Sequence, residues 1–193
     1  MVNTSRLGFR PVKSIGGEPF EGGFNMYFIP ASDGTAVYKG DMVKLAGDAD
    51  STTGVPTVAR ASTTDVPLLG VVVGFAPDPT NLNIGGTYRA ASTARYVYVA
   101  DNPETLFEAQ GSASVTTTML GNNASIDNGT GSTTTGFSSQ AVDVATVATT
   151  AALGLKIVAF KPSPDNEFPG TADKVFVKIN NHSYGTGTGA TGV

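Results

Sequence analysis

Short runs of β-forming residues, separated by turn-forming residues, occur along most of this 193-residue chain. Val, Tyr, Phe and Thr dominate the runs, and Gly, Pro, Asn and Asp lie between them. In residues 94–99 the tyrosines fall on one face and the valines on the other, and residues 174–179 alternate in the same way. Residues 68–75 are almost continuously apolar, which is typical of a strand buried on both faces. This spacing predicts an all-β protein, built as a small β-barrel or a sandwich.

The strand runs become regular only after residue 29, which divides the chain into segments. Residues 1–29 combine glycine pairs with aromatic residues and predict an extended N-terminal arm without regular structure. Residues 30–182 form the predicted β domain. Within it, residues 111–150 are rich in Gly, Ser, Thr, Ala and Asn and predict a polar excursion that supplies little core. Residues 183–193 predict a flexible tail.

The side chains that carry most enzymatic chemistry are scarce. The chain has one histidine and no cysteine, which argues against thiolate zinc sites and against histidine-based catalysis. A hydrolase that uses two carboxylates remains an alternative, but no two acids are marked as partners by the sequence. We therefore expect a non-enzymatic protein that uses no cofactor and no metal.

Three segments resemble known functional sites, but each lacks a feature that the site requires. Residues 187–192 match the glycine pattern of dinucleotide sites, but too few residues follow to form the helix that such a site needs. A calcium loop starting at Asp48 would require glycine where Thr53 stands and an acid where Ala59 stands, so an acidic hairpin turn fits better. His182 follows the last predicted strand without a nucleophile motif to serve, and we expect a surface histidine there.

Charge is distributed unevenly along the chain, whose net charge is −4. Residues 1–17 contain Arg6, Arg10 and Lys13 and no acid, so the remainder is acidic. An acidic body argues against a nucleic-acid partner, and no apolar run is long enough for a membrane helix. Residues 1–20 lack the apolar core of a secretion signal, so we expect the protein to be made in the cytoplasm.

The predicted arm is the place where docking residues are most expected. Its rings must be buried somewhere, either on the chain's own domain or across a neighbouring subunit. Its basic residues either dock on an acidic surface or form a solvated terminus. The candidates for docking, which are apolar or basic on a segment without predicted strands, are Phe9, Arg10, Phe20, Phe24 and Tyr27.

The order of the segments resembles that of the head decoration, or capsid cement, proteins of tailed bacteriophages. The similarity spans most of residues 7–182 and lies in the general character and order of the segments rather than in one signature motif. A G-D-x-V-x-L strand followed by an L-G-V-V strand is shared with several such proteins that contain small β-barrels. The segments that carry it are Gly-Phe-Arg-Pro-Val (8–12), Tyr-Phe-Ile-Pro-Ala-Ser-Asp (27–33), Gly-Asp-Met-Val-Lys-Leu (40–45), Leu-Gly-Val-Val-Val-Gly (69–74), Ala-Arg-Tyr-Val-Tyr-Val-Ala-Asp (94–101), Pro-Asp-Asn-Glu (164–167) and Val-Lys-Ile-Asn-Asn-His (177–182).

This resemblance implies a protein that binds the outside of a phage capsid and stabilises the shell. Its partners would be the major capsid protein and other copies of itself, in a homotrimer, and it would be located on the exterior of the virion after synthesis in the cytoplasm of the bacterial host. The alternative is another virion component, such as a tail or fibre-base protein with a carbohydrate-binding β module. In that alternative, Tyr96 and Tyr98 would line a sugar groove instead of packing across strands.

Overall fold

The computed structural model of the chain describes residues 6–77, 86–164, 166, 170, 172–185, 189, 191 and 192. Within these ranges the regular secondary structure is β, apart from one short 3-10 helix, η1 (Thr117–Met119). The all-β class predicted from the sequence is confirmed. The strands are β1 (Arg10–Ser14), β2 (Asn25–Ile29), β3 (Val37–Tyr38), β4 (Met42–Ala49), β5 (Pro56–Arg60), β6 (Gly70–Phe75), β7 (Tyr88–Arg89), β8 (Arg95–Ala100), β9 (Thr105–Gln110), β10 (Asn123–Asp127), β11 (Ala141–Ala148), β12 (Leu155–Phe160) and β13 (Lys174–Ile179).

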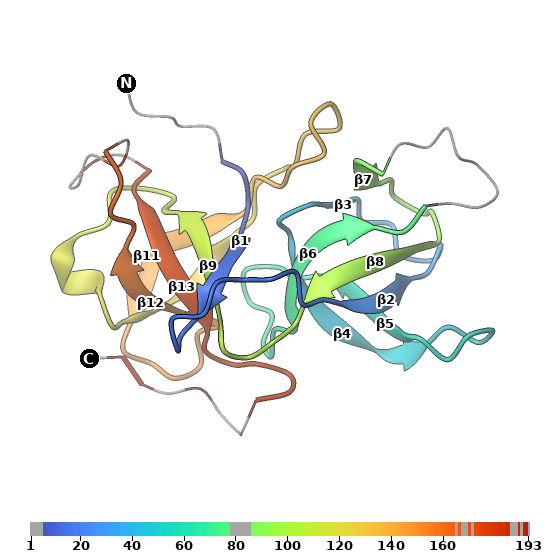
Figure 1. Cartoon of the computed structure of the whole chain (residues 1–193), viewed down its shortest axis with the longest axis horizontal. Helices are drawn as coiled ribbons and strands as arrows, with labels where there is room; N and C mark the ends of the chain where they lie inside the picture. Colours follow the sequence, from blue (N-terminus) through green and yellow to red (C-terminus); the bar gives the residue numbers. More distant parts are fainter. Residues whose placement is uncertain are drawn as a thin grey trace.

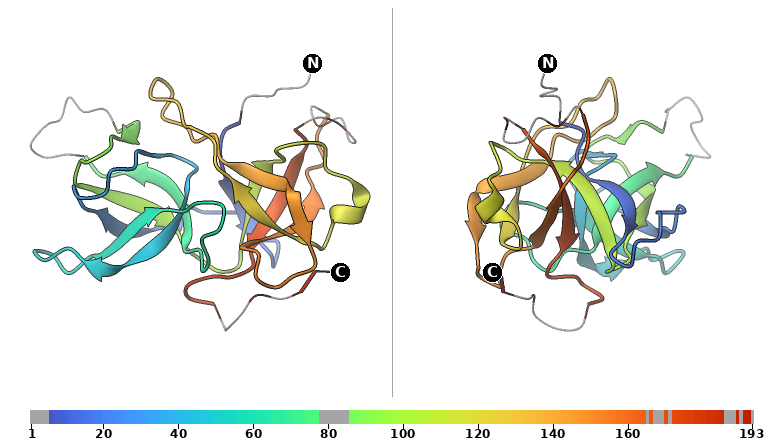
Figure 2. Two further views of the ribbon diagram at one scale, coloured as in Figure 1. Left: turned by 180° about the vertical axis from the view of Figure 1, so that it is seen from behind. Right: turned by 60° about the vertical axis from the view of Figure 1, so that its left-hand side comes forward.

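The strands form two lobes that lie side by side along the long axis of the molecule (Figure 1). In one lobe, β2, β5, β4, β6 and β8 pair in that order and close into a barrel. The other lobe is a six-stranded sheet with the order β1, β9, β13, β12, β10 and β11. This sheet curls until Gly111, directly after β9, forms a parallel bridge with Val142 of β11 (Figure 2). We call the two lobes the barrel and the curled sheet.

Alternating side chains fill both lobes as the sequence predicts. In β8 and β13 the valines are buried and the residues between them lie on the outer face. Strand β6 lies where the lobes meet, so its two faces enter different cores. Val72 packs inside the barrel, whereas Val71 belongs to the core that continues into the curled sheet. This position explains why residues 68–75 are almost continuously apolar.

The two lobes repeat one topology. Strands β2, β4, β5, β6 and β8 of the barrel correspond, in chain order, to β9, β10, β11, β12 and β13 of the curled sheet. In both sets the first strand pairs with the fifth, the fifth with the fourth, the fourth with the second and the second with the third, always antiparallel. In both sets the third strand also meets the first in parallel. The sequence did not predict this internal repeat.

The repeat extends to the register of individual residues. Before the second strand of the barrel, the Gly40 N–H donates to Val72 O at 2.8 Å, and Gly121 donates to Ile157 O at 2.8 Å in the curled sheet. Both glycines have a positive φ, 90° and 80° respectively, which glycine adopts without strain. Both fourth strands then carry a register shift against the fifth strand, directly after Val72 and Ile157. A shared bulge and a shared turn place the equivalent residues without ambiguity.

The prediction of an N-terminal arm without regular structure is wrong. Residues 10–14 form β1 and residues 25–29 form β2, one in each lobe. Phe9, directly before β1, is only 1% exposed and packs in the core of the curled sheet. Aromatic residues lie on both faces of β2, so no alternation of apolar and polar residues was visible in the sequence. The arm therefore folds back onto its own chain.

The prediction of a polar excursion at residues 111–150 is also wrong in its effect on the core. This segment supplies η1, β10 and β11, and Ala124, Ile126 and Val142 are almost completely buried. Small side chains suffice here because the opposite walls of a tightly curled sheet lie close together. The connection at residues 128–140 leaves the sheet and reaches across to the barrel (Figure 1).

A buried polar network joins this connection to the barrel. The Ser138 hydroxyl donates to Asp41 Oδ1 at 2.6 Å, and Arg60 Nε lies 3.0 Å from Asp41 Oδ2. Gln140 accepts from the Met42 N–H at 2.7 Å and donates to a carbonyl after β5. The hydrogen bonds of Asp41 and Gln140, and the charge of Arg60 beside Asp41, hold the connection against the barrel where water is excluded, which fixes how the lobes dock.

The described part of the predicted tail is hydrogen-bonded rather than free. The Ser183 N–H donates to Leu68 O at 2.7 Å, and the Gly189 N–H donates to the Asn181 side chain at 2.6 Å. Gly192 also donates to a carbonyl of the curled sheet, at Thr149. Part of the glycine pattern at residues 187–192 lies outside the described residues.

Candidate binding surface

The outer side of the barrel carries an aromatic face made by β2 and β8. The antiparallel register places Met26 opposite Tyr98 and Phe28 opposite Tyr96. Because side chains alternate along a strand, all four point outward, and Phe24 joins them from the chain before β2. The ring centroids of Phe24 and Tyr98 are 4.8 Å apart, and those of Phe28 and Tyr96 are 5.0 Å apart. Phe24 and Met26 are 49% and 46% exposed, so apolar surface at one end of this face meets solvent.

The hairpin between β4 and β5 borders this aromatic face. The Tyr96 hydroxyl donates to Asp50 Oδ2 at 2.6 Å, and the Thr53 hydroxyl donates to the same oxygen at 2.5 Å. These hydrogen bonds, the one from Thr53 first, lower the pKa of Asp50. The acidic hairpin turn expected from the sequence is present, and its carboxylate holds the turn against the barrel.

Two of the five candidate docking residues are buried within the chain. Tyr27 is 3% exposed and its hydroxyl donates to Asp101 Oδ2 at 2.6 Å. Burial, together with the Asp101 carboxylate, raises the pKa of Tyr27 far above its usual range, so the hydroxyl stays protonated. The Asn25 amide also donates to Asp101, at 2.9 and 3.0 Å. Tyr27 and Phe9 therefore hold the fold together and are not available to a partner.

The other three candidates reach the surface, but at separate places. Phe24 lies on the aromatic face described above. Arg10 and Phe20 line a hollow of about 280 Å³ between the lobes, with Lys39 and Phe137 on the barrel side of the junction. The floor of this hollow is apolar and both charged residues of its lining are basic. The structure brings Arg10 and Phe20 together and leaves Phe24 on its own.

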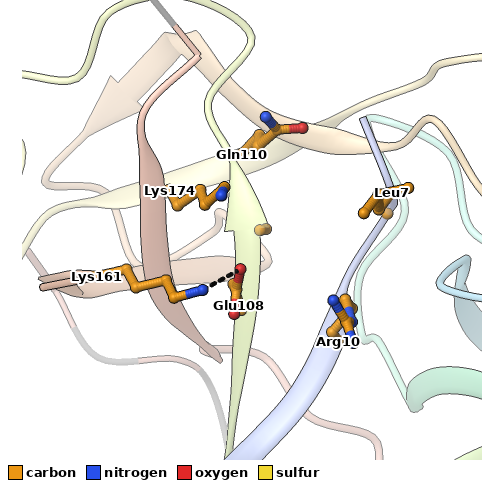
Figure 3. Close-up of a pocket in the computed structure, with 8 residues that line it drawn as sticks. Leu7, Arg10, Glu108, Gln110, Lys161 and Lys174 are labelled. Atoms are coloured by element: carbon orange, nitrogen blue, oxygen red, sulfur yellow. Dashed lines mark hydrogen bonds and ion pairs between the residues drawn. The ribbon is translucent and has the colours of Figure 1, made fainter. Parts of the chain in front are cut away.

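A second hollow lies on the other side of Arg10, along β9 (Figure 3). Glu108 lies between Arg10 and Lys161, and its carboxylate is 3.0 Å from Lys161 Nζ. Lys174 and Gln110 complete the polar wall. Three cations, Arg10, Lys161 and Lys174, and one carboxylate, Glu108, therefore line this hollow. Arg10 belongs to β1, so this basic residue of the N-terminal segment lies on the curled sheet and does not extend away from it.

His182 is buried, so the prediction of a surface histidine is wrong. It is 7% exposed because residues 181–183 pair with Leu68 of the barrel, a contact between segments far apart in the sequence. Its Nδ1 accepts the Tyr184 N–H at 3.0 Å, which places the proton of the neutral ring on Nε2. Burial lowers the pKa of His182 below its usual 6.5.

This pKa shift predicts a pH-dependent stability. The unfolded chain binds a proton at His182 more readily than the folded chain, so the free energy of unfolding falls as the pH drops through 6.5. The slope is at most about 1.4 kcal/mol per pH unit for one group. Urea unfolding of the protein and of His182→Gln, compared at about pH 7.5 and pH 5.5, isolates it, because the chain has no other histidine. Equal pH dependence of the two proteins would contradict the assignment.

The sequence predicted only half of the aromatic face. Alternation in residues 94–99 correctly placed Tyr96 and Tyr98 together, but their partners on β2 were assigned to an irregular arm. The signal that was available is the alternation of Phe24, Met26 and Phe28 with residues that turn inward. It was hidden because Tyr27, which is also aromatic, is one of the inward residues.

No family model matches this chain, and comparison with curated proteins and with solved structures finds no similar protein. Within the described ranges, no three His, Asp or Glu side chains gather closely enough to hold a metal ion. Among the residues that the structure describes, no helix is long and apolar enough to cross a membrane. The aromatic face of β2 and β8 is the candidate binding surface, because Phe24 and Met26 are exposed at its end.

Proposed function

We propose that this chain is a non-enzymatic structural protein of a bacteriophage virion, which binds the outside of the capsid shell and stabilises it. The observation that carries the proposal is the aromatic face of β2 and β8, whose exposed end, Phe24 and Met26, lies on a rigid barrel. The resemblance of the segment order to capsid cement proteins points to the same role. On this proposal the partner is the major capsid protein, and the chain acts as a homo-oligomer on the virion exterior.

The aromatic face suits contact with another protein for physical reasons. Fully burying a large apolar side chain contributes about 1.5–3 kcal/mol, and Phe24 and Met26, each about half exposed, would gain roughly half of that on docking. Aromatic residues are enriched among the residues that dominate protein interfaces, and the Phe24 ring, which already packs on Tyr98, loses little entropy on binding. A capsid presents many identical sites, so an oligomer that binds several at once gains affinity from modest individual contacts.

Replacing Phe24 with glutamate is expected to weaken binding to the shell by at least about tenfold. The charge enters the exposed end of the aromatic face, which would have to bury it on docking. Co-sedimentation with shells assembled from the coat protein of the same virus measures the occupancy. A thermal melt of these shells, with and without the protein, measures the stabilisation.

Ile15→Glu is the matched control, because Ile15 is 51% exposed but lies away from the aromatic face. It should bind the shell like the unmodified protein. If Phe24→Glu binds shells as well as the unmodified protein, the aromatic face is not the docking surface. If the unmodified protein does not bind shells at all, the proposed capsid role is wrong. Binding to a saccharide on a glycan array, in place of shells, would favour the carbohydrate-binding alternative.

A further inference from the structure

Strand β2 has one open edge. On its other edge, β8 pairs with all five residues from Asn25 to Ile29. On the open side, β5 meets β2 only where Phe28 pairs with Thr57. In the part of the chain that the structure describes, no strand pairs with residues 25–27 on that side. An unpaired edge presents backbone N–H and C=O groups that can accept another strand.

The internal repeat shows what such an edge can hold. In the barrel, Val99 of β8 pairs with Val72 of β6 on one side and with Asn25 of β2 on the other. In the curled sheet, Val177 of β13 pairs with Ile157 of β12 on one side and with Phe107 of β9 on the other. Asn25 of β2 therefore corresponds to Phe107 of β9.

In the curled sheet, β1 fills the edge that is open in the barrel. It runs antiparallel to β9 on the side away from β13, with Pro11 opposite Phe107 and Arg10 opposite Glu108. The residues of β2 that correspond to this pairing are Asn25 and Met26. The barrel has no counterpart of β1 among the described residues, so the same position beside β2 is vacant of backbone partners.

The exposed fractions of equivalent side chains agree with this difference. Leu106, beside β1, is 4% exposed, whereas Phe24 in the equivalent position is 49% exposed. Phe107 is fully buried, whereas Asn25 is exposed. A strand added beside β2 would cover Phe24 and Asn25, just as β1 covers the equivalent residues of β9 in the curled sheet.

We propose that the open edge of β2 binds an extended segment of a different polypeptide as an additional antiparallel strand, in the position that β1 occupies beside β9. Such strand addition takes its affinity from backbone hydrogen bonds and its specificity from alternate side chains. The apolar side chains of the segment pack on Phe24 and Met26.

Charge defines the rest of the partner's chemistry. Asp101 is hydrogen-bonded to Asn25 at one end of the edge, and Asp50 is hydrogen-bonded to Tyr96 at the other. Glu21 precedes the edge in the chain and lines a hollow that reaches Gly23. A segment that combines apolar and basic residues complements these acids, and residues 8–15, which contain Phe9, Arg10 and Lys13, are a sequence of this kind.

A second copy of this chain does not meet that requirement. Its own basic strand, β1, is already paired with β9. Pairing of two β2 edges would bring the acids around Asp50 of one copy toward those around Asp101 of the other, which is unfavourable. The inference rests on the strand register and the charges alone, and it holds whether or not the partner is a capsid subunit.

The test uses the full chain, labelled with nitrogen-15, and a synthetic peptide with the sequence of residues 8–15 as the probe. Added at millimolar concentration, this peptide should shift the backbone amide signals of residues 23–27. A second peptide, with glutamate in place of its arginine and lysine, should bind at least about tenfold more weakly. Met26→Lys should weaken binding of the basic peptide by a similar factor, because it adds a cation to the edge.

Ile15→Lys is the control, since it adds the same charge at an exposed position outside the edge. It should leave peptide binding unchanged. The proposal is overturned if the amide signals of residues 23–27 do not move, or if the acidic peptide binds as well as the basic one. Shifts of these signals on concentrating the protein alone would show that a second copy fills the edge, and would overturn the proposed partner.

Discussion

Replacing Asp41 with alanine is expected to lower the free energy of unfolding by about 3–5 kcal/mol. Asp41 is fully buried and accepts hydrogen bonds from the Ser138 hydroxyl at 2.6 Å and the Tyr38 N–H at 2.8 Å. Its third partner, Arg60, lies 3.0 Å away and would lose its counter-charge in a largely buried position. Breaking one half of a buried pair is more harmful than removing both halves, because the remaining charge stays without compensation.

Chemical unfolding of Asp41→Ala and Glu104→Ala measures this difference. Glu104 pairs with Lys178 at 3.0 Å but is 53% exposed, so its loss should change the free energy of unfolding by no more than about 1 kcal/mol. Asp41→Asn keeps acceptor and shape and should fall between the two. If the two alanine variants unfold alike, the buried network does not contribute to the docking of the lobes as described.

Replacing Arg89 with methionine is expected to destabilise the chain by about 3–5 kcal/mol. The Arg89 side chain is fully buried at one end of the barrel, on β7. Burial lowers the pKa of Arg89, which Asp33 counteracts, but a guanidinium remains charged at any ordinary pH. Its N–H groups donate to four backbone carbonyls at 2.5–2.8 Å, those of Pro30, Asp33, Thr35 and Thr93.

Methionine fills similar space but leaves these four carbonyls without donors. Arg89→Lys retains the charge with fewer donors and without the planar fork, so its loss of stability should be smaller. Hydrogen exchange of residues 30–35 provides a local measurement, since this loop is held through its carbonyls. Equal stability of Arg89→Met and the unmodified chain would contradict the role of Arg89 as the organiser of this loop.

The elements that were predictable from sequence are those whose alternation is simple. Strands β8 and β13 carry valines on one face and larger or polar side chains on the other, so their faces could be assigned. Strand β2 carries rings on both faces and looked irregular, although Tyr27 fills the barrel and Phe28 lies outside. The contribution of residues 111–150 to the core was underestimated, because small residues such as Ala124 can complete a core where the opposite walls of a curled sheet lie close together.

Contacts between distant segments account for the rest. Nothing in the local sequence marks His182 as buried, because its cover is a bridge to Leu68 in the other lobe. The same holds for Phe9, which was expected at the surface with Arg10 but packs in the core while Arg10 stays outside. Of the candidate docking residues, Arg10, Phe20 and Phe24 still lie where a partner can reach them, and their role in docking stays a prediction.

The order of the strands in the chain also governs the order in which the lobes can join during synthesis. Strand β1 is made first, but its partner β9 emerges only after the whole barrel has been made. At typical ribosomal rates this interval is about 5–20 seconds. The barrel can therefore complete its own pairing while β1 still has no partner strand. Strand β1, the first strand of the chain, can pair only once the ribosome has made β9, the first strand of the second repeat.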